Sequence, residues 1–386
     1  MDKRLLVLAL GTFAIGTDNY VVAGILPRVA QSLEVSIAAA GQLITVYSLA
    51  YALLTPVMAT LTAHWPRRRV LLCGLAVFVA GNILTATQAT FEFVLLGRAV
   101  AGLGGAMFTP NAGATAAALV TPERRGHALA IVVAGLSSAT ALGAPIGTLV
   151  GSFGDWRTTM WLVACLGGLA AIGVPAVLPH VPAPPALGLR ERLAPLGDAR
   201  VAATLATTLL FMFGVFLVYA YFSVVFDRAT NGDGMRIAAL MSSWGIGATL
   251  GSLGAGSLTD RFGSRRVINT AIVIVTLDFA FMPFASATMA GALAALILWG
   301  ICGWALVVAQ QHRLVGIAPA LSPILLALNA AAIYLAISAS GAAGALIMRG
   351  LDPHDLPFLS TALILASVLA AELAHRLIQR RKPELW

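Results

Sequence analysis

Long apolar segments recur along the whole of this 386-residue chain. Each is at least about 18 residues long, the length that a helix needs to cross the hydrocarbon core of a bilayer. Hydrophobic residues make up 59% of the chain and charged residues 10%, whereas soluble domains carry about 25% charged residues. The sequence therefore predicts an all-α membrane protein with twelve transmembrane helices. Their expected positions are 5–27, 39–62, 70–89, 92–118, 127–151, 157–178, 201–226, 236–258, 267–286, 288–311, 322–347 and 356–377.

Lysine and arginine residues are divided unevenly between the two sides of these expected spans. If the N-terminus lies in the cytoplasm, 18 of the 24 fall in loops on that side and five on the other, while Arg98 lies inside a span. The positive-inside rule then places both termini in the cytoplasm, and it accounts for the net charge of +8 without a nucleic-acid partner. Lys3 and Arg4 also resemble the start of a signal peptide. The apolar run continues to Pro27 without a convincing cleavage site, so we expect a retained first span.

A Pro-rich, charged break at 180–200 divides the expected spans into six and six. The loop "LTAHWPRRRV" at 61–70 aligns with "LTDRFGSRRV" at 258–267, which is an offset close to half the chain length. A unit repeated at half length indicates two related bundles with a transport path between them. The predicted division is an N-terminal six-helix bundle at 1–179, a cytoplasmic linker at 180–200 and a C-terminal six-helix bundle at 201–386.

Three charged residues lie well within expected spans: Asp18, Arg98 and Asp278. Each costs about 2.5–3.5 kcal/mol to insert, so such residues usually face the protein interior. Asp18 is expected about 20 Å into the first span, and Arg98 about 9 Å into the fourth span from the opposite side, so their depths allow a pair. Two interpretations are open for the pair: a carboxylate that loads and releases a proton, or a static buried ion pair. Asp278 is a second candidate titrating site unless its helix is peripheral.

Polar and aromatic side chains within the spans are candidate contacts for a transported molecule. Asn19, next to Asp18, both donates and accepts hydrogen bonds, although a helix-packing role is equally open. Rings with hydrogen-bonding neighbours suit a flat ligand, but packing against lipid or other helices is the alternative for each. These candidates are Tyr47, Tyr219, Tyr221, Phe222, Trp299, Trp304, Gln310, Gln311, Asn329 and Tyr334.

Two glycine-containing motifs point to helix packing and to conformational change. "GAPIGTLVG" spaces Gly143, Gly147 and Gly151 four residues apart, with Pro145 between them, which predicts close approach of another helix and a bend. "GSLTDRFGSRR" at 256–266 joins two expected spans. It is interpreted either as a hinge or latch or as a simple topology anchor. The residues concerned are Asp260, Arg261, Gly263 and Arg265.

Catalytic motifs are absent from the sequence: there is no Walker P-loop, no HExxH and no GxSxG elbow in a suitable context. The six histidines fall in loops or at span ends, and the cysteines at 73, 165 and 302 fall in apolar spans as small hydrophobes. We therefore expect no enzyme activity, no metal and no cofactor.

These motifs together resemble the major facilitator superfamily, in its drug:proton antiporter branch with twelve spans. "GSLTDRFGSRR" is similar to the loop motif of that family, "RAVAGLGGA" to its helix 4 motif with Arg98 and Gly102, and "GAPIGT" to its exporter motif. "GTDNYVVAGILPRVAQSLEVSIAAAGQL", "GQLITVYSLAYA", "YAYF" and "WALVVAQQ" resemble bacterial purine base and nucleoside efflux pumps and the related sugar-efflux and chloramphenicol-efflux proteins. The sequence departs from the family pattern in two places, the first-half loop and the first span. Ala63 and His64 replace the aspartate and arginine of the first-half loop, and Asn19 stands where relatives often carry glutamate.

The resemblance implies the major facilitator fold and proton-driven export of a small polar or heterocyclic molecule by alternating access, with a purine base or nucleoside as cargo. A multidrug or chloramphenicol-type antibiotic exporter and a sugar-efflux transporter are the alternatives, and a non-transporting receptor on the same fold is a third. The expected partners are protons, the small-molecule cargo and the lipid bilayer. The expected setting is a monomer in the bacterial inner membrane, with Asp18 exchanging the proton and Arg98 tuning it.

Overall fold

The structure, a computed structural model, describes residues 2–121, 124–179, 181 and 187–380. In these ranges it is built from helices and contains no β-strand. Twelve helices, some made of consecutive segments, are long and apolar enough to cross a membrane. The predicted all-α membrane protein with twelve spans is thereby confirmed. The segments are α1 (Lys3–Ser32), α2 (Ile37–Ala40), α3 (Gln42–Leu61), α4 (Arg67–Thr87), α5 (Phe91–Ala118), α6 (Arg125–Ser138), η2 (Ala139–Gly143), α7 (Ala144–Ser152), α8 (Arg157–Val177), α9 (Leu189–Leu193), η3 (Ala194–Gly197), α10 (Ala199–Tyr219), α11 (Phe222–Val225), α12 (Asp227–Thr230), α13 (Gly234–Phe262), α14 (Ser264–Ala285), α15 (Met289–Ile317), η4 (Pro319–Leu321), α16 (Ser322–Ile347), η5 (Pro353–Asp355) and α17 (Leu356–Arg380).

The seventh span ends earlier than the sequence predicts. The apolar pattern predicts one helix over 201–226, but α10 stops and the short helix α11 starts at Phe222. Tyr221 stands at the break, where its hydroxyl donates to the Gly341 carbonyl at 2.7 Å and its ring lies against Gly344. No glycine or proline lies near the break in sequence, so these contacts with α16 account for it better than local propensity does.

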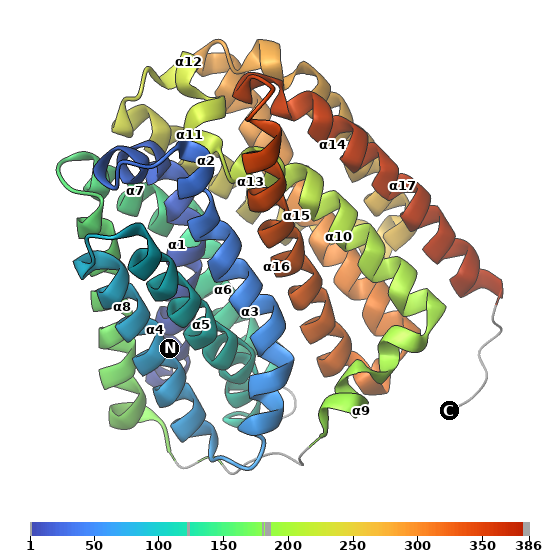
Figure 1. Cartoon of the computed structure of the whole chain (residues 1–386). Coiled ribbons are helices and arrows are strands. Elements are labelled where there is room, and N and C mark those ends of the chain that lie inside the picture. The colour runs from blue at the N-terminus through green and yellow to red at the C-terminus, as the bar shows by residue number, and fades with distance from the viewer. Residues whose placement is uncertain (1, 122–123, 180, 182–186, 381–386) are drawn as a thin grey trace.

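The first six spans lie largely on the left of Figure 1 and the last six largely on the right. In the first half α4 packs against α5 and α8, and in the second α13 packs against α15 and α10 against α17. The two halves meet where α16 runs beside α3 and where α13 runs beside α7. This is the predicted arrangement of two six-helix bundles.

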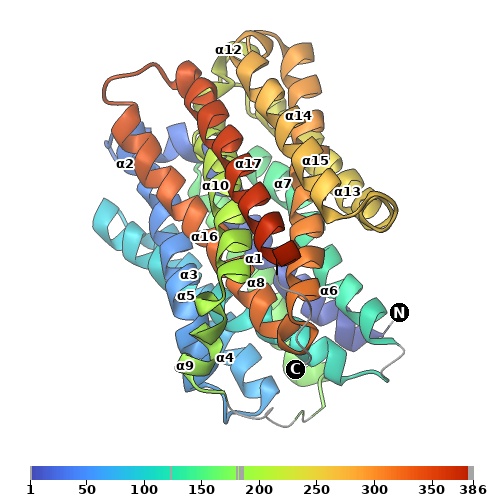
Figure 2. The same cartoon turned by 90° about the vertical axis from the view of Figure 1, so that its right-hand side faces the viewer.

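The two ends of the molecule differ. One end, called here the linker end, carries the start of α1, the linker helix α9 and the end of α17, in the lower half of Figures 1 and 2. The opposite end, called the distal end, carries α2, α11 and α12. At the distal end the halves touch directly at two places: Thr148 donates to the Met241 sulfur at 3.3 Å, and Gly234 lies so close to Ser152 that a side chain would not fit.

Candidate functional site

The most deeply buried charges of the described chain form one ion pair. Arg98 of α5 donates from Nη1 to Oδ1 of Asp18 on α1 at 2.5 Å, and the two side chains are 1% and 0% exposed. Asp18 Oδ2 and Arg98 Nε have no hydrogen-bond partner among the described residues. A buried ion pair is stable only when its remaining lone pairs and protons also form hydrogen bonds. This pair is incomplete in that sense, because one carboxylate oxygen and one guanidinium N–H form none within the described chain.

Two further buried groups surround the ion pair. The Arg98 guanidinium lies over the ring of Tyr47 on α3, 4.4 Å from its centroid, which is a cation–π contact. Asn82 of α4 is fully buried beside Asp18, and its Nδ2 donates to the Phe78 carbonyl at 3.1 Å. The Asn82 amide oxygen and the Tyr47 hydroxyl have no described partner. Sequence reasoning missed Asn82, since a single amide in an apolar span gave no signal of what it faces.

A cavity of about 170 Å³ lies between the two halves. Its walls come from α1, α3, α5, α6, α10, α13, α15 and α16, and none of the described residues that line it is charged. The lining is rich in rings and amides: Tyr20, Tyr51, Phe211, Phe216, Trp244, Trp299, Trp304, Gln311, Asn329 and Tyr334. Such a cavity suits a neutral, flat molecule that carries hydrogen-bonding groups.

A stacked pair of tyrosines crosses between the halves at this cavity. Tyr51 of α3 and Tyr334 of α16 have ring centroids 3.7 Å apart at an interplanar angle of 18°. Tyr47 lies next to Tyr51, with centroids 6.5 Å apart. A chain of contacts therefore runs from Arg98 through Tyr47 and Tyr51 to the second half.

The structure separates the predicted cargo residues into those that line the cavity and those that do not. Trp299 and Asn329 line it. Tyr219 and Phe222 lie behind the wall as buried rings whose centroids are 5.8 Å apart and whose planes are tilted by 55°. Gln310 is fully buried and donates to the Thr204 carbonyl at 3.1 Å, which ties α15 to α10.

On α1, the residue that lines the cavity is Tyr20, which sequence reasoning missed. Asp18 and Asn19 are both buried and are not part of the cavity lining. Tyr20 accepts a hydrogen bond at its carbonyl from Tyr219 at 3.3 Å, and its ring lies 5.7 Å from that of Trp244. The sequence offers the same apolar context for all three neighbours, so rotation of the helix decides which one is exposed to the cavity.

Asp278 lies apart from this group. It is partly buried on α14, which packs against α15 and α17 within the second half. Its Oδ2 has no described hydrogen-bond partner, and no charged partner is recorded for it in the described chain. The ion pair and the cavity are therefore built without Asp278.

The glycines of α7 and η2 pack against one face of α1. Thr17 lies against Gly143, Val21 against Gly147 and Ile25 against Gly151. Methyl groups added to Gly147 and Gly151 would approach Val21 and Ile25 to 2.7 Å and 3.1 Å. Pro145 lies just after the π-helical segment η2, where the regular helix is interrupted. The spacing thus positions the helix that carries Asp18.

The first turn of α14, just after the loop that follows α13, is held at the linker end by an ion pair to α17. Arg265 donates to both carboxylate oxygens of Glu372, at 3.0 Å and 2.7 Å. Gly263 has φ 78° and ψ 151°, a conformation open almost only to glycine. Asp260 is exposed, and Arg261 lies over the Phe262 ring at 5.1 Å.

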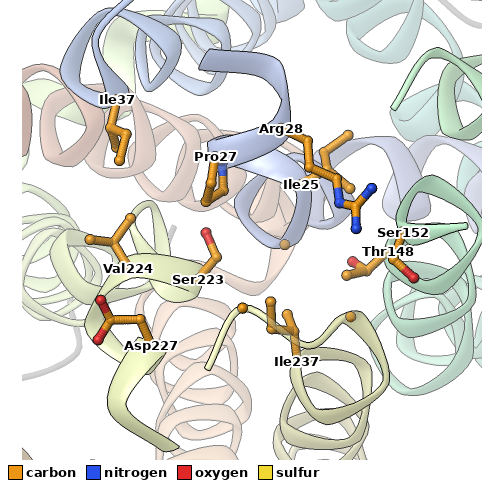
Figure 3. A pocket seen from close by; sticks show the side chains of 13 residues that line it. Ile25, Pro27, Arg28, Ile37, Thr148, Ser152, Ser223, Val224, Asp227 and Ile237 are labelled. Atoms are coloured by element: carbon orange, nitrogen blue, oxygen red, sulfur yellow. The ribbon is translucent and has the colours of Figure 1, made fainter. Parts of the chain in front are cut away.

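A second cavity, of about 240 Å³, lies between the halves at the distal end (Figure 3). Arg28 from α1 and Asp227 from α12 stand on different walls of it. Asp227 accepts from His354 Nε2 at 2.7 Å, while Nδ1 of that imidazole is 2.5 Å from Asp352. Hydrogen bonds from the backbone and side chain of His354 lower the pKa of Asp352. These contacts fasten α12 to the loop between α16 and α17.

Two six-helix bundles that span a membrane and enclose a cavity between them define the architecture of a secondary transporter. A family model described as Major Facilitator Superfamily matches residues 8–345. The chain therefore belongs to the Major Facilitator Superfamily and is a multi-pass membrane transporter, not an enzyme.

Three known proteins illustrate the similarity. The inner membrane transport protein YdhP of Escherichia coli strain K12 is 29% identical over 92% of this chain and 92% of its own length. A chloramphenicol resistance protein of Streptomyces lividans is 34% identical over 68% of each chain. A solved bacterial homologue of the lysosomal transporter Spinster, in an inward-facing and unoccupied conformation, has a TM-score of 0.76 at 16% identity and covers 99% of this chain and 98% of its own.

Proposed function

We propose that this transporter exports a small, neutral, flat molecule in exchange for protons, with a purine base or nucleoside as the first candidate cargo. The aromatic and amide lining of the central cavity supports this cargo class, since rings stack on rings and amides match the edges of a heterocycle. The absence of charge among the described lining residues disfavours an ionic cargo. In this proposal Trp299 and Asn329 contact cargo directly, together with Tyr20 and Gln311. Asn19, Tyr47, Tyr219, Phe222 and Gln310 act from behind the wall.

The observation that carries proton coupling is the incomplete buried pair of Asp18 and Arg98. A proton taken up by the Asp18 carboxylate removes the negative charge that holds the guanidinium. Arg98 then keeps its contact with the Tyr47 ring, and Tyr47 touches the tyrosine stack that joins the halves. Protonation of the Asp18 carboxylate is thus coupled to the contact between the two halves.

Alternating access follows if 1–179 and 201–386 move as two bodies joined by the linker at 180–200, part of which lies outside the described residues. We assign the linker end, which carries the start of α1 and the end of α17, to the cytoplasm. The basic loops favour the same orientation, with both termini cytoplasmic. The glycines at 143 and 147 with Pro145 position α1, and the loop motif of Asp260, Arg261, Gly263 and Arg265 acts as a latch. We place a monomer in the bacterial inner membrane.

Transport by purified protein in proteoliposomes tests this proposal. Radiolabelled adenine is offered with and without an imposed pH gradient. The wild-type chain should accumulate adenine only with the gradient, and Asp18→Asn should lose that accumulation while retaining exchange of adenine across the membrane. Asp278→Asn is the matched control, since it removes a span carboxylate outside the cavity and the ion pair. Gradient-driven accumulation that survives in Asp18→Asn contradicts the coupling role.

A chloramphenicol-type antibiotic exporter is the second candidate. The 34% identity to a chloramphenicol resistance protein favours it. If chloramphenicol is a cargo, unlabelled chloramphenicol and unlabelled purines compete for the central cavity. If chloramphenicol displaces labelled adenine and is itself accumulated while adenine is not, the antibiotic is the cargo.

A further inference from the structure

A third cavity, of about 190 Å³, lies between the halves toward the linker end. It is formed by α3, α4, α5 and the linker helix α9 on one side and by α16 on the other. The central cavity is about one helical turn away along the same helices. On α3, Tyr51 lines the central cavity and Thr55 lines the third cavity. On α5, Thr109 lines the central cavity and the next residue, Pro110, lines the third. This third cavity, called the mouth cavity, therefore stands at the opening of the proposed path.

The mouth cavity carries positive charge on one wall. Arg67 at the start of α4 and Arg192 of α9 both line it, and its other polar lining residues are Thr55, Thr62 and Asn111. No aspartate or glutamate is present among the described residues of the lining. Glu191, which neighbours Arg192 in sequence, instead accepts from the Gly188 backbone at 2.9 Å.

Most of the donor capacity of the two guanidinium groups is not used within the described chain. Arg67 donates from its side chain to Asn111 Oδ1. Arg192 donates to the Leu187 carbonyl at 3.2 Å and to the Ala59 carbonyl at 3.3 Å. A guanidinium has five N–H donors, so several stay available at each arginine.

The sequence explains why no carboxylate neutralises this wall. Ala63, which also lines the mouth cavity, stands where the resembling loop motif has aspartate. The opening of α4 adds the partial positive charge of a helix N-terminus on the side of Arg67. Two part-buried arginines without an acid favour an anion that fits their planar forks.

The opposite wall is apolar. It consists of the α16 residues Pro323, Ile324, Ala327, Leu328 and Ala331. Apolar residues of the first half also line the cavity: Pro56, Ala59, Ala63, Pro110 and Ala114. A ligand in the mouth cavity therefore meets cations from the first half and the linker, and hydrocarbon from the second half.

We propose that the mouth cavity is a binding site for a phosphate group, held by Arg67 and Arg192. The ligand is either a phospholipid headgroup, whose acyl chain lies on the α16 wall, or a soluble phosphate. It is distinct from the neutral cargo of the central cavity, so this site stands or falls independently of the proposed transport activity.

Binding is tested on the purified full-length chain with two probes. Inorganic phosphate is titrated into detergent-solubilised protein at constant ionic strength set with chloride, and the midpoint of thermal unfolding is followed. In parallel, protein is extracted from vesicles of phosphatidylcholine alone or of phosphatidylcholine with phosphatidylglycerol. Lipid that stays bound is identified by its mass in native mass spectrometry. The variants are Arg67→Gln and Arg192→Gln. Arg69→Gln is the matched control, because Arg69 is exposed in the same first turn of α4 and its replacement removes the same charge.

Phosphate should raise the unfolding midpoint of the wild-type chain and of Arg69→Gln, and each site variant should weaken this binding about tenfold. If phosphate has no effect but phosphatidylglycerol is retained by wild type and by Arg69→Gln and lost from both site variants, the ligand is the lipid headgroup. Either pattern supports the site. Equal binding by all variants, or no binding of either probe by the wild type, overturns it. Arg192→Gln changes only a short linker helix, so this variant still tests the site if Arg67→Gln fails to fold.

Discussion

Arg98 and Asp18 lie 80 residues apart in sequence, yet their side chains meet at 2.5 Å with almost no exposure to solvent. Within the described part of the chain, one carboxylate oxygen has no hydrogen-bond donor and the guanidinium Nε has no acceptor. Removal of one member leaves the other charge buried and unpaired, which is more costly than removal of both.

Asp18→Asn is therefore expected to destabilise the protein by about 3–5 kcal/mol, and Asp18→Asn combined with Arg98→Gln should recover part of that loss. Reversible unfolding of the solubilised chain measures these free energies. Asp278→Asn is the control and should not destabilise, since its carboxylate has no described partner to lose. A double variant that is less stable than Asp18→Asn would argue against the pair as the cause.

Gly143→Ala should destabilise by about 1–3 kcal/mol, because the added methyl group has no room against Thr17 and must push α1 away. Gly168→Ala is the comparison: a Cβ there meets no atom within 4 Å, and alanine is the better helix former. Thermal unfolding of both variants checks the difference. Equal stability of the two variants would refute close packing as the role of Gly143.

Gln310→Ala and Gln311→Ala should have opposite consequences although the residues are neighbours. Gln310 is buried and bonded to the Thr204 carbonyl, so its loss should reduce stability by about 1–3 kcal/mol. Gln311 lines the central cavity, so its loss should weaken cargo binding with little effect on stability. Unfolding and cargo-binding measurements on the same preparations separate the two. The assignment fails if Gln310→Ala changes only binding.

The stability of the protein should depend more on the backbone conformation of the loop motif at Gly263 than on the charge of Arg265. Gly263→Ala forces alanine to φ 78° and should cost about 1–3 kcal/mol. Arg265→Gln breaks an ion pair in which the arginine is 51% exposed, so only a small loss of stability is expected, and a smaller one at high salt. Stability measured across a salt series compares the variants. A larger loss for Arg265→Gln than for Gly263→Ala would contradict this order.

Much of the architecture could be predicted from the chain alone. Apolar length predicts the twelve spans, because backbone groups in a bilayer must bond within their own helix. Depth within the spans predicts that Asp18 and Arg98 are able to pair, and the structure pairs them. Glycines four residues apart predict close helix approach, which is present at Gly143 and Gly147.

Other features of the site depend on the rotation and contacts of each helix. Neighbouring residues on a helix differ by about 100° in direction, so a sequence rich in apolar residues on all sides does not say which one meets the cavity. Tyr20 lines the cavity while Asn19 does not, and Gln311 lines it while Gln310 bonds within its bundle.

The sequence by itself determined that this chain crosses a membrane twelve times and that Asp18 and Arg98 lie at depths that allow them to pair. These properties follow from length, hydropathy and spacing, which are local. Only the tertiary structure decided which α1 residue faces the cavity, why α10 stops before Tyr221, and that Arg67 and Arg192 share one wall without an acid. These depend on contacts between helices far apart in the chain, and such contacts leave no periodic pattern in the sequence.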